Sequence, residues 1–225
     1  MDYLWIYTSI AGALLGAACL AYVRETKIGL WGYAQFDKVL DYLRDKYNKP
    51  GNVFCGVIHR LDRPVSGVVL FAKTSKALSR MNELFRTKSI QKTYWAIVEK
   101  APNKACGTLE HYLIKNQQKN KSHAYLKLHK GALKAVLNYK TLKHLDRYTL
   151  LEINPISGRH HQIRVQLSTI NSIIKGDLKY GAKRSNEDAS ICLHAREINF
   201  VHPVKKEMIK ICAPPPKYPI WEACL

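Results

Sequence analysis

The sequence predicts an α+β domain with a mixed, mainly antiparallel sheet and flanking helices and loops. Apolar, β-branched runs outnumber amphipathic helical segments, and the two kinds do not alternate in the regular way that builds a parallel sheet. The composition of the 225 residues, 47% hydrophobic and 24% charged, is typical of a globular protein. A chain of this length buries a sizeable core without disulfides.

The first 27 residues differ from the rest of the chain. The run Leu4–Val23 carries no charge and is long enough to cross a bilayer, but no Lys or Arg precedes it as in a secretory signal. Three interpretations stay open for residues 1–27: a membrane anchor that leaves the rest of the chain in the cytoplasm, a core helix, or a start assigned upstream of the true domain. Residues 28–225 are expected to form one folded domain.

The next segments are expected to be one helix and two buried strands. Apolar residues at helical spacing predict an amphipathic helix over Phe36–Tyr47. Two apolar runs, Val53–Ile58 and Val68–Ala72, predict strands on either side of a polar loop that contains Pro64 and Gly67.

The remaining elements follow from the same patterns. A helix starting after a cap at Thr74 or Ser75 is expected to run to about Thr87, and a second helix over Arg159–Leu167. The basic stretch Lys115–Lys130 predicts an exposed loop or an edge hairpin. Further strands are expected at Tyr94–Val98, Ala135–Leu142, Tyr148–Ile153, Glu197–Val201 and Met208–Cys212.

The charge and the cysteines narrow the class of protein. Lys and Arg number 36 against 17 Asp and Glu, a net charge of +19, which favours a polyanionic partner: nucleic acid first, an anionic membrane surface second. The six cysteines form no C-x-x-C pair, so we expect reduced thiols in a cytoplasmic protein and neither zinc nor iron–sulfur ligation.

A first candidate site is the loop that carries Asp62. This single carboxylate lies in the sequence among His59, Arg60 and Arg63, and neighbouring cations stabilise a negative charge. A charged Asp on a loop restricted by Pro64 suits a nucleophile or a base in a pocket that attracts phosphates. A salt-bridged turn that only joins two strands explains the same residues.

Two more stretches carry polar groups beside apolar runs. Tyr94, in a predicted strand, offers a ring for stacking and a hydroxyl for proton transfer, although an aromatic residue in a strand is usually core. Arg164, in the predicted helix and about one turn from His160 and His161, is suited to clamp a carboxylate or phosphate. No third ligand supports a metal site at the histidines.

Together these stretches resemble the signature motifs of the RluA-type pseudouridine synthases. The resemblance covers about Phe36 to Cys212, with the motifs in the order and at the spacing of that family. The matching motifs are His59-Arg60-Leu61-Asp62-x-x-x-Ser66-Gly67, Lys92-x-Tyr94-x-Ala96, Gly158-Arg159-x-His161-Gln162-Ile163-Arg164-Val165, Gly176-Asp177-x-x-Tyr180-Gly181, and Leu193-His194-Ala195 followed by Phe200-x-His202-Pro203. Val65 and Gln166 stand where many relatives have Thr and His.

The resemblance implies an enzyme that isomerises uridine to pseudouridine in structured RNA, rRNA or tRNA, without cofactor or metal. It implies that Asp62 is the catalytic carboxylate, that Tyr94 packs on the target base and helps remove the proton from carbon 5, and that Arg164 pairs with Asp62. Arg60 is expected to help hold the target nucleotide out of its helix. The resemblance extends the substrate-binding set to His59, Arg60, Arg63, Ser66, Arg159, His161, Gln162, Ile163 and Leu193.

It further implies the pseudouridine synthase fold, and we expect a monomer. Two alternatives remain. One is a non-catalytic RNA-binding or ribosome-assembly protein that retains the fold, and the other is a membrane-tethered enzyme anchored through residues 4–23. An intact set of catalytic motifs weighs against the first alternative, because a protein that only binds RNA has no need for Asp62.

Overall fold

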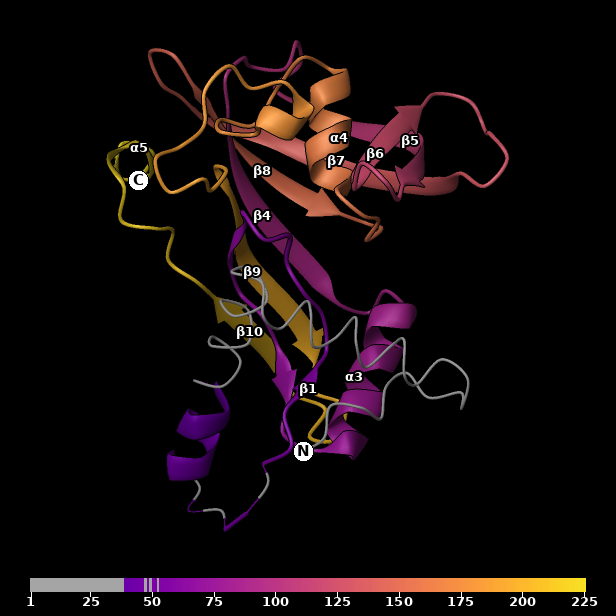
Figure 1. Ribbon diagram of the computed structural model, residues 1–225, viewed down its shortest axis with the longest axis vertical. Coiled ribbons are helices and arrows are strands. Elements are labelled where there is room, and N and C mark those ends of the chain that lie inside the picture. Colours follow the sequence, from indigo (N-terminus) through magenta and orange to yellow (C-terminus); the bar gives the residue numbers. More distant parts are fainter. Residues whose placement is uncertain (1–38, 47, 49, 52) are drawn as a thin grey trace. The chain divides into compact units, whose positions relative to one another are not determined.

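The computed structural model describes residues 39–225 except 47, 49 and 52 (Figure 1). These residues divide into two compact units, one with residues up to 56 and 72–75, the other with 57–71 and 76–225. The apolar run at residues 4–23 lies outside the described residues, as does the start of the first predicted helix. Residues 39–46 of that helix are helical.

An eight-stranded sheet dominates the second unit. Its order is β10-β9-β4-β8-β7-β5-β6, and the short strand β2 (Ser66–Gly67) pairs with β9 in parallel, so the sheet is mixed and mainly antiparallel as predicted. The strands along this path are β4 (Gln91–Val98), β5 (Cys106–Asn116), β6 (Lys121–Tyr125), β7 (Leu133–His144), β8 (Thr149–Pro155), β9 (Leu193–Val201) and β10 (Met208–Cys212).

The strand predictions were confirmed in the second half of the chain and partly wrong in the first. The runs expected to form strands at Val53–Ile58 and Val68–Ala72 contribute only the two-residue strands β1 (Gly56–Val57) and β3 (Phe71–Ala72). Strand β5 was missed over most of its length. The stretch Lys115–Lys130 contains an edge hairpin, because β5 and β6 pair through Asn116 and Lys121 and β6 ends the sheet order.

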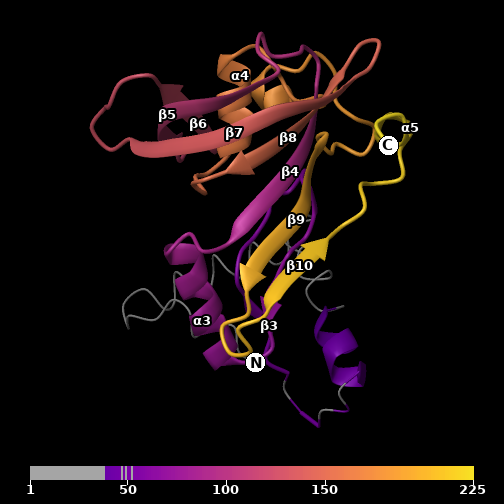
Figure 2. The ribbon, with the colours of Figure 1, turned by 180° about the vertical axis from the view of Figure 1, so that it is seen from behind.

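Two longer helices pack near the two ends of this sheet (Figures 1 and 2). Helix α3 (Ser75–Arg86) agrees with the prediction and buries Met81 in a cluster with Val68, Ile198 and Phe200. Helix α4 (Gln162–Thr169) lies against β5 and β6. Two short helical turns complete the unit, η2 (Leu178–Tyr180) and α5 (Pro219–Glu222).

The main core lies where the central strands meet α4. Ile97 of β4, Leu137 of β7, Ile153 of β8 and Leu167 of α4 are all completely or almost completely buried. Trp221 near the C-terminus joins the same cluster. This core therefore fixes β4 and α4, which carry Tyr94 and Arg164, relative to each other.

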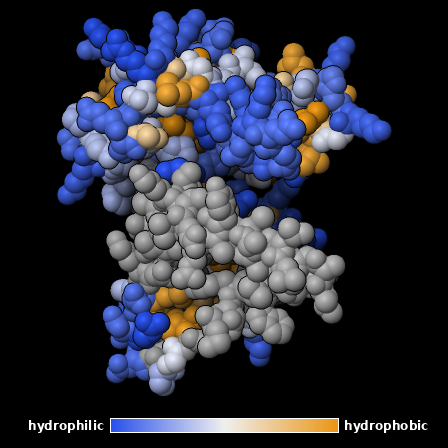
Figure 3. All heavy atoms as spheres, viewed as in Figure 1, coloured by the Kyte–Doolittle hydropathy of each residue, from blue (hydrophilic) through white to orange (hydrophobic). Residues whose placement is uncertain are grey.

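The part of the chain that the structure describes contains no helix long and apolar enough to span a membrane. Hydrophilic side chains dominate the described portion of the face in Figure 3, with hydrophobic ones scattered among them.

Candidate active site

A short turn holds the loop that carries Asp62. The Val65 N–H donates to the Asp62 carbonyl at 2.9 Å, and the Ile191 N–H donates to the Pro64 carbonyl at 2.9 Å. These bonds tie the turn to the segment that leads into β9. The Asp62 side chain is therefore presented from a backbone that is hydrogen-bonded on both sides.

The loop then enters the sheet at a position that only glycine fits. Gly67 has φ +120°, and a Cβ at this residue would lie 2.3 Å from the Ala195 carbonyl oxygen. This close approach allows the Val68 N–H to donate to the same carbonyl at 2.9 Å. The glycine of the sequence motif is thus a backbone requirement of the β2–β9 pairing.

His194 connects this loop to the C-terminal segment. Its Nε2 lies 3.1 Å from the Ala213 carbonyl oxygen, and its Nδ1 lies 2.9 Å from the Ser66 hydroxyl. Because a carbonyl only accepts, Nε2 carries the proton and Nδ1 accepts from Ser66. The Ser66 hydroxyl therefore anchors the Asp62 loop to His194 of β9.

Helix α4 brings Arg164 to Asp62, but it begins later than predicted. His161 adopts the left-handed conformation, φ 52°, immediately before the helix, so His160 and His161 precede α4 instead of lying within it. Arg164 occupies the first turn, and its side chain is buried, with 5% exposed. Since α4 packs on the core, the guanidinium group has little freedom to move.

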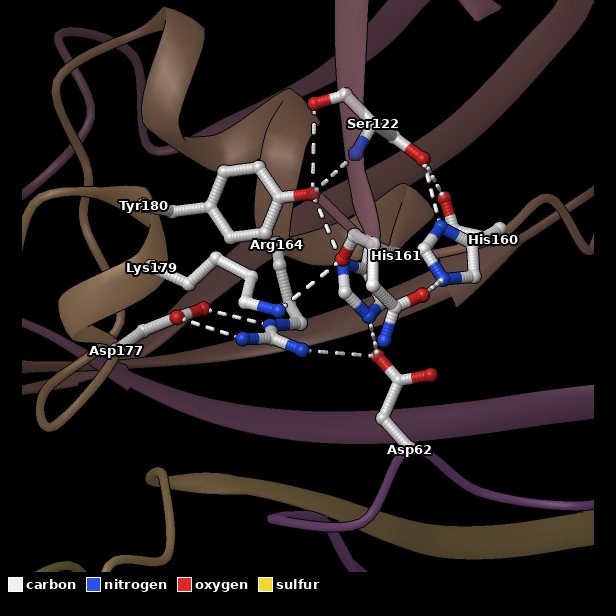
Figure 4. Close-up of polar contacts among 9 residues, drawn as sticks. Asp62, Ser122, His160, His161, Arg164, Asp177, Lys179 and Tyr180 are labelled. Atoms are coloured by element: carbon white, nitrogen blue, oxygen red, sulfur yellow. Dashed lines mark hydrogen bonds and ion pairs between the residues drawn. The ribbon is translucent and has the colours of Figure 1, made fainter. Parts of the chain in front are cut away.

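Two carboxylates share the Arg164 guanidinium (Figure 4). Nε and Nη2 each donate to one oxygen of Asp177 at 2.7 Å, a bidentate pair with a carboxylate that is 1% exposed. Nη1 donates to Oδ2 of Asp62 at 3.2 Å, and Asp62 is 29% exposed. The guanidinium therefore joins an interior carboxylate to one that faces the cavity.

A tyrosine and a histidine complete this arrangement. The Tyr180 hydroxyl accepts from the Ser122 N–H at 2.9 Å and lies 3.0 Å from His161 Nδ1, while the Tyr180 ring packs beside Arg164. Burial and the nearby Arg164 charge lower the pKa of His161 to about 3. The neutral ring places Nε2 at 3.6 Å from Asp62 Oδ2, and the tautomer with its proton on Nε2 suits that carboxylate and leaves Nδ1 to accept from Tyr180.

Asp62, His161 and Arg164 line a cavity of about 220 Å³. Tyr94 forms part of its wall, and burial together with the Asp62 charge raises the pKa of Tyr94 to about 12. Ten of the twelve site residues expected from the sequence line the cavity: His59, Arg60, Asp62, Tyr94, Arg159, His161, Gln162, Ile163, Arg164 and Leu193.

Some expected residues have other surroundings than the sequence suggested. Arg63 is exposed and, like Ser66, is not part of the cavity wall. Among the described residues, the ion-pair partner of Asp62 is Arg164, and the neutral His161 ring lies beside it; the sequence neighbours Arg60 and Arg63 form no ion pair with Asp62. The charge partner of this carboxylate thus comes from α4, while Arg60 lines the same cavity without pairing with it.

Two expected binding residues are already engaged with the protein. His59 Nε2 accepts from the Leu70 N–H at 3.2 Å, and burial with the Lys92 charge lowers its pKa to about 4, so it is neutral near pH 7. Gln162 accepts from the Ser157 hydroxyl at 2.8 Å and the Arg159 N–H at 3.0 Å. Both side chains therefore shape the wall of the cavity.

Sequence reasoning did not assign Asp177, Tyr180 or Lys92 to the site. Asp177 and Tyr180 belong to the motif Gly176-Asp177-x-x-Tyr180-Gly181, to which the resemblance assigns no role, and Lys92 belongs to the motif of Tyr94. The residues that Asp177 and Tyr180 contact lie far away in the sequence. The motif therefore marked these two residues but did not show which side chains they contact. Among residues 39–225, leaving aside 47, 49 and 52, no group of three or more His, Cys, Asp or Glu side chains is placed to hold a metal ion.

Comparison with known proteins identifies relatives of this chain. A family model described as RNA pseudouridylate synthase matches residues 35–169. A ribosomal large subunit pseudouridine synthase C of Buchnera aphidicola is 35% identical over 74% of this chain and 55% of its own length. A tRNA pseudouridine synthase C of Haemophilus influenzae is 32% identical, covering 78% of each chain.

The fold agrees as well. The solved structure of human RNA pseudouridylate synthase domain containing 4 superimposes with a TM-score of 0.69 and 24% identity, covering 84% of this chain and 82% of the human one. The chain spans little more than half the length of several curated relatives that it matches. The family model covers more than half of the 225 residues, and the chain belongs to the RNA pseudouridylate synthase family.

Proposed function

We propose that this protein isomerises uridine to pseudouridine in structured RNA, either rRNA or tRNA, with Asp62 as the catalytic carboxylate and without a metal or cofactor. The observation that carries the proposal is the placement of Asp62 in the cavity, 3.2 Å from a buried arginine that a second carboxylate already holds. The names of the relatives that act on large-subunit rRNA and on tRNA support the substrate class.

The reaction requires few catalytic side chains. Uracil leaves the anomeric carbon through nitrogen 1, turns within the cavity and rejoins the ribose through carbon 5, which loses its proton. Oδ2 of Asp62 is occupied by Arg164, whereas Oδ1 has no hydrogen-bond partner in the described part of the chain (Figure 4). Oδ1 is therefore the atom that attacks the anomeric carbon or removes a proton from the ribose.

Tyr94 enters the reaction as a neutral phenol. With its pKa raised to about 12, the hydroxyl keeps its proton near pH 7. Its ring packs on the uracil and its hydroxyl assists the transfer of the carbon 5 proton through a hydrogen bond, rather than as a resting phenolate. Ile163 and Leu193 give apolar walls to the same cavity and help to exclude water.

The charge of the chain supports an RNA substrate. A net charge of +19 favours binding to a polyanion, and such binding weakens steeply as salt rises. A uridine in a paired region must leave its helix to reach the cavity, at a cost of a few kcal/mol that phosphate contacts offset. The five described cysteines are free, which is typical of a reducing compartment and supports placing the protein in the cytoplasm.

The test is direct. The protein is incubated with unmodified tRNA and large-subunit rRNA transcripts, and pseudouridine is mapped chemically at single-nucleotide resolution. We expect modification at defined uridines by the wild type and none by Asp62→Asn. Tight, salt-sensitive RNA binding without any pseudouridine would favour the non-catalytic RNA-binding alternative.

A further inference from the structure

A second hollow adjoins the active-site cavity and is rich in positive charge. It is lined by Phe85, Arg86, Lys88, Ile90, Lys92 and Ile156–Arg159, and we call it the basic groove. None of its lining residues is acidic. Of its four cations only Arg86 is paired with a carboxylate in the described chain, so the other three form an electropositive channel that suits a nucleic-acid backbone.

The basic groove and the active-site cavity share part of their walls. Phe85, Lys92, Ser157, Gly158 and Arg159 line both. An RNA strand with one nucleotide in the cavity and the next in the basic groove must pass its connecting phosphodiester over these five residues. Two of the five are cations, and this junction therefore has the chemistry of a phosphate site.

Lys92 is the more unusual of the two cations. Its side chain is half-buried at the start of β4, and among the described residues it has no carboxylate partner. The Phe85 ring lies 5.8 Å from its Nζ. Burial lowers the pKa of Lys92. Holding an ammonium group away from water without a counter-ion is unfavourable, and a phosphate that binds there removes that penalty.

The neighbouring backbone leaves room for such a phosphate. Gly158 lies beside the Lys92 ammonium group, where a Cβ on the glycine would come within 3.6 Å of Nζ. Arg159 is exposed, and its Nε donates to the Lys134 carbonyl at 3.2 Å, which leaves both Nη atoms without a hydrogen-bond partner in the described chain. Arg86, by contrast, is paired with Glu83 and is less available.

We infer that the basic groove binds the nucleotide adjacent to the target uridine, and that Lys92 and Arg159 bind the phosphodiester that connects the two. This inference rests on the proposed function for the identity of the nucleotide in the cavity. It adds a binding subsite that directs the RNA strand along one side of the active site. Lys92 is thereby a phosphate-binding residue.

The experiment measures RNA binding separately from catalysis. Affinity for a fluorescent oligouridylate of about a dozen nucleotides is titrated from about 50 to 200 mM salt. For Lys92→Gln we expect weaker binding and a slope of log affinity against log salt that is shallower by about 0.7, the value of one phosphate contact on a single strand. Lys104→Gln, which removes an equal charge beyond the opposite end of β4, keeps the wild-type slope.

Two further variants keep the test decisive. Lys92→Arg retains the charge and is expected to retain the slope. Arg159→Gln alters an exposed side chain and is expected to lower the slope as Lys92→Gln does, even if Lys92→Gln folds poorly. Slopes for Lys92→Gln and Arg159→Gln equal to that of Lys104→Gln overturn the inference, as does a wild type that does not bind the oligonucleotide.

The two proposals fail in different ways. If the basic groove has no such role, the slopes are equal while the wild type still forms pseudouridine. If the proposed isomerisation is wrong, the transcripts acquire no pseudouridine while the slopes still differ as described.

Discussion

Asp177 and Asp62 contact the same guanidinium group, yet their surroundings are opposite. Asp177 is 1% exposed and makes two hydrogen bonds of 2.7 Å to Arg164, whereas Asp62 is 29% exposed and makes one of 3.2 Å. The interior carboxylate neutralises and orients the arginine. The carboxylate in the cavity is left with an oxygen free for chemistry. Burial, rather than residue type, separates a structural role from the proposed catalytic one.

The largest effect on stability is expected from Asp177→Asn. The substitution leaves the buried Arg164 without its bidentate partner, and breaking a buried pair on one side lowers the free energy of unfolding by about 3–5 kcal/mol. Urea denaturation measures the loss. The control is Asp146→Asn at an exposed position, which should change stability by less than about 0.5 kcal/mol. Similar losses for both variants would show that the interior pair does not stabilise the fold.

Gly67→Ala tests the backbone that presents Asp62. The alanine Cβ would meet the Ala195 carbonyl oxygen at 2.3 Å in addition to the strain of φ +120°. Gly131→Ala is a matched control, because Gly131 has φ +80° with open space around it and isolates the backbone strain. We expect Gly67→Ala to be less stable than Gly131→Ala by about 1–3 kcal/mol in urea denaturation. Equal losses of stability in the two variants would mean that the close approach of Gly67 to Ala195 does not contribute to the effect.

Stability is expected to fall in acid because of His161. Its pKa is lowered from 6.5 to about 3 in the folded chain, so between these values the unfolded chain binds more protons. The free energy of unfolding should therefore rise with pH from about 3 to 6.5, and this contribution levels off above that range. Urea denaturation across this range should give a shallower pH dependence for His161→Gln than for the wild type. Parallel curves would contradict a buried, neutral histidine beside Asp62.

The smallest effect on stability is expected from Asp62→Asn. Arg164 keeps both bonds to Asp177, and the pair that is lost is partly exposed, so the free energy of unfolding should change by less than about 1 kcal/mol. The same denaturation assay measures it. A loss as large as that of Asp177→Asn would erase the distinction between the two carboxylates.

Local patterns predicted what depends on local chemistry. The apolar stripe of α3 and the alternation of apolar and polar residues in β10 were sufficient to place both elements. Apolar residues recur with a fixed period along the buried face of a helix or a strand. Strand β5 was missed because His111 occupies a buried position between Leu109 and Leu113, where an apolar residue would have revealed the alternation. The ring of His111 is accommodated by hydrogen bonds with Gln166 and Thr169, which the sequence does not indicate.

The site was predictable as a set of residues and not as a set of contacts. Motif order singled out Asp62 and Arg164, which are 102 positions apart and lie 3.2 Å from each other. The contact of Arg164 with Asp177 depends on where η2 follows α4 in space, so no spacing rule could supply it. The runs near Val53 and Val68 failed as long strands because a strand needs a partner backbone, which an apolar run alone does not guarantee.

The most direct test of the central claim is the single-turnover release of tritium from RNA labelled at carbon 5 of uridine. Asp62→Asn protein, with an unfolding midpoint equal to that of the wild type, is compared with the wild type at saturating RNA. The account predicts that the rate falls by at least about 10³-fold, because the reacting carboxylate is gone from an intact cavity. Release within about tenfold of the wild-type rate would contradict the assignment of Asp62 as the catalytic group.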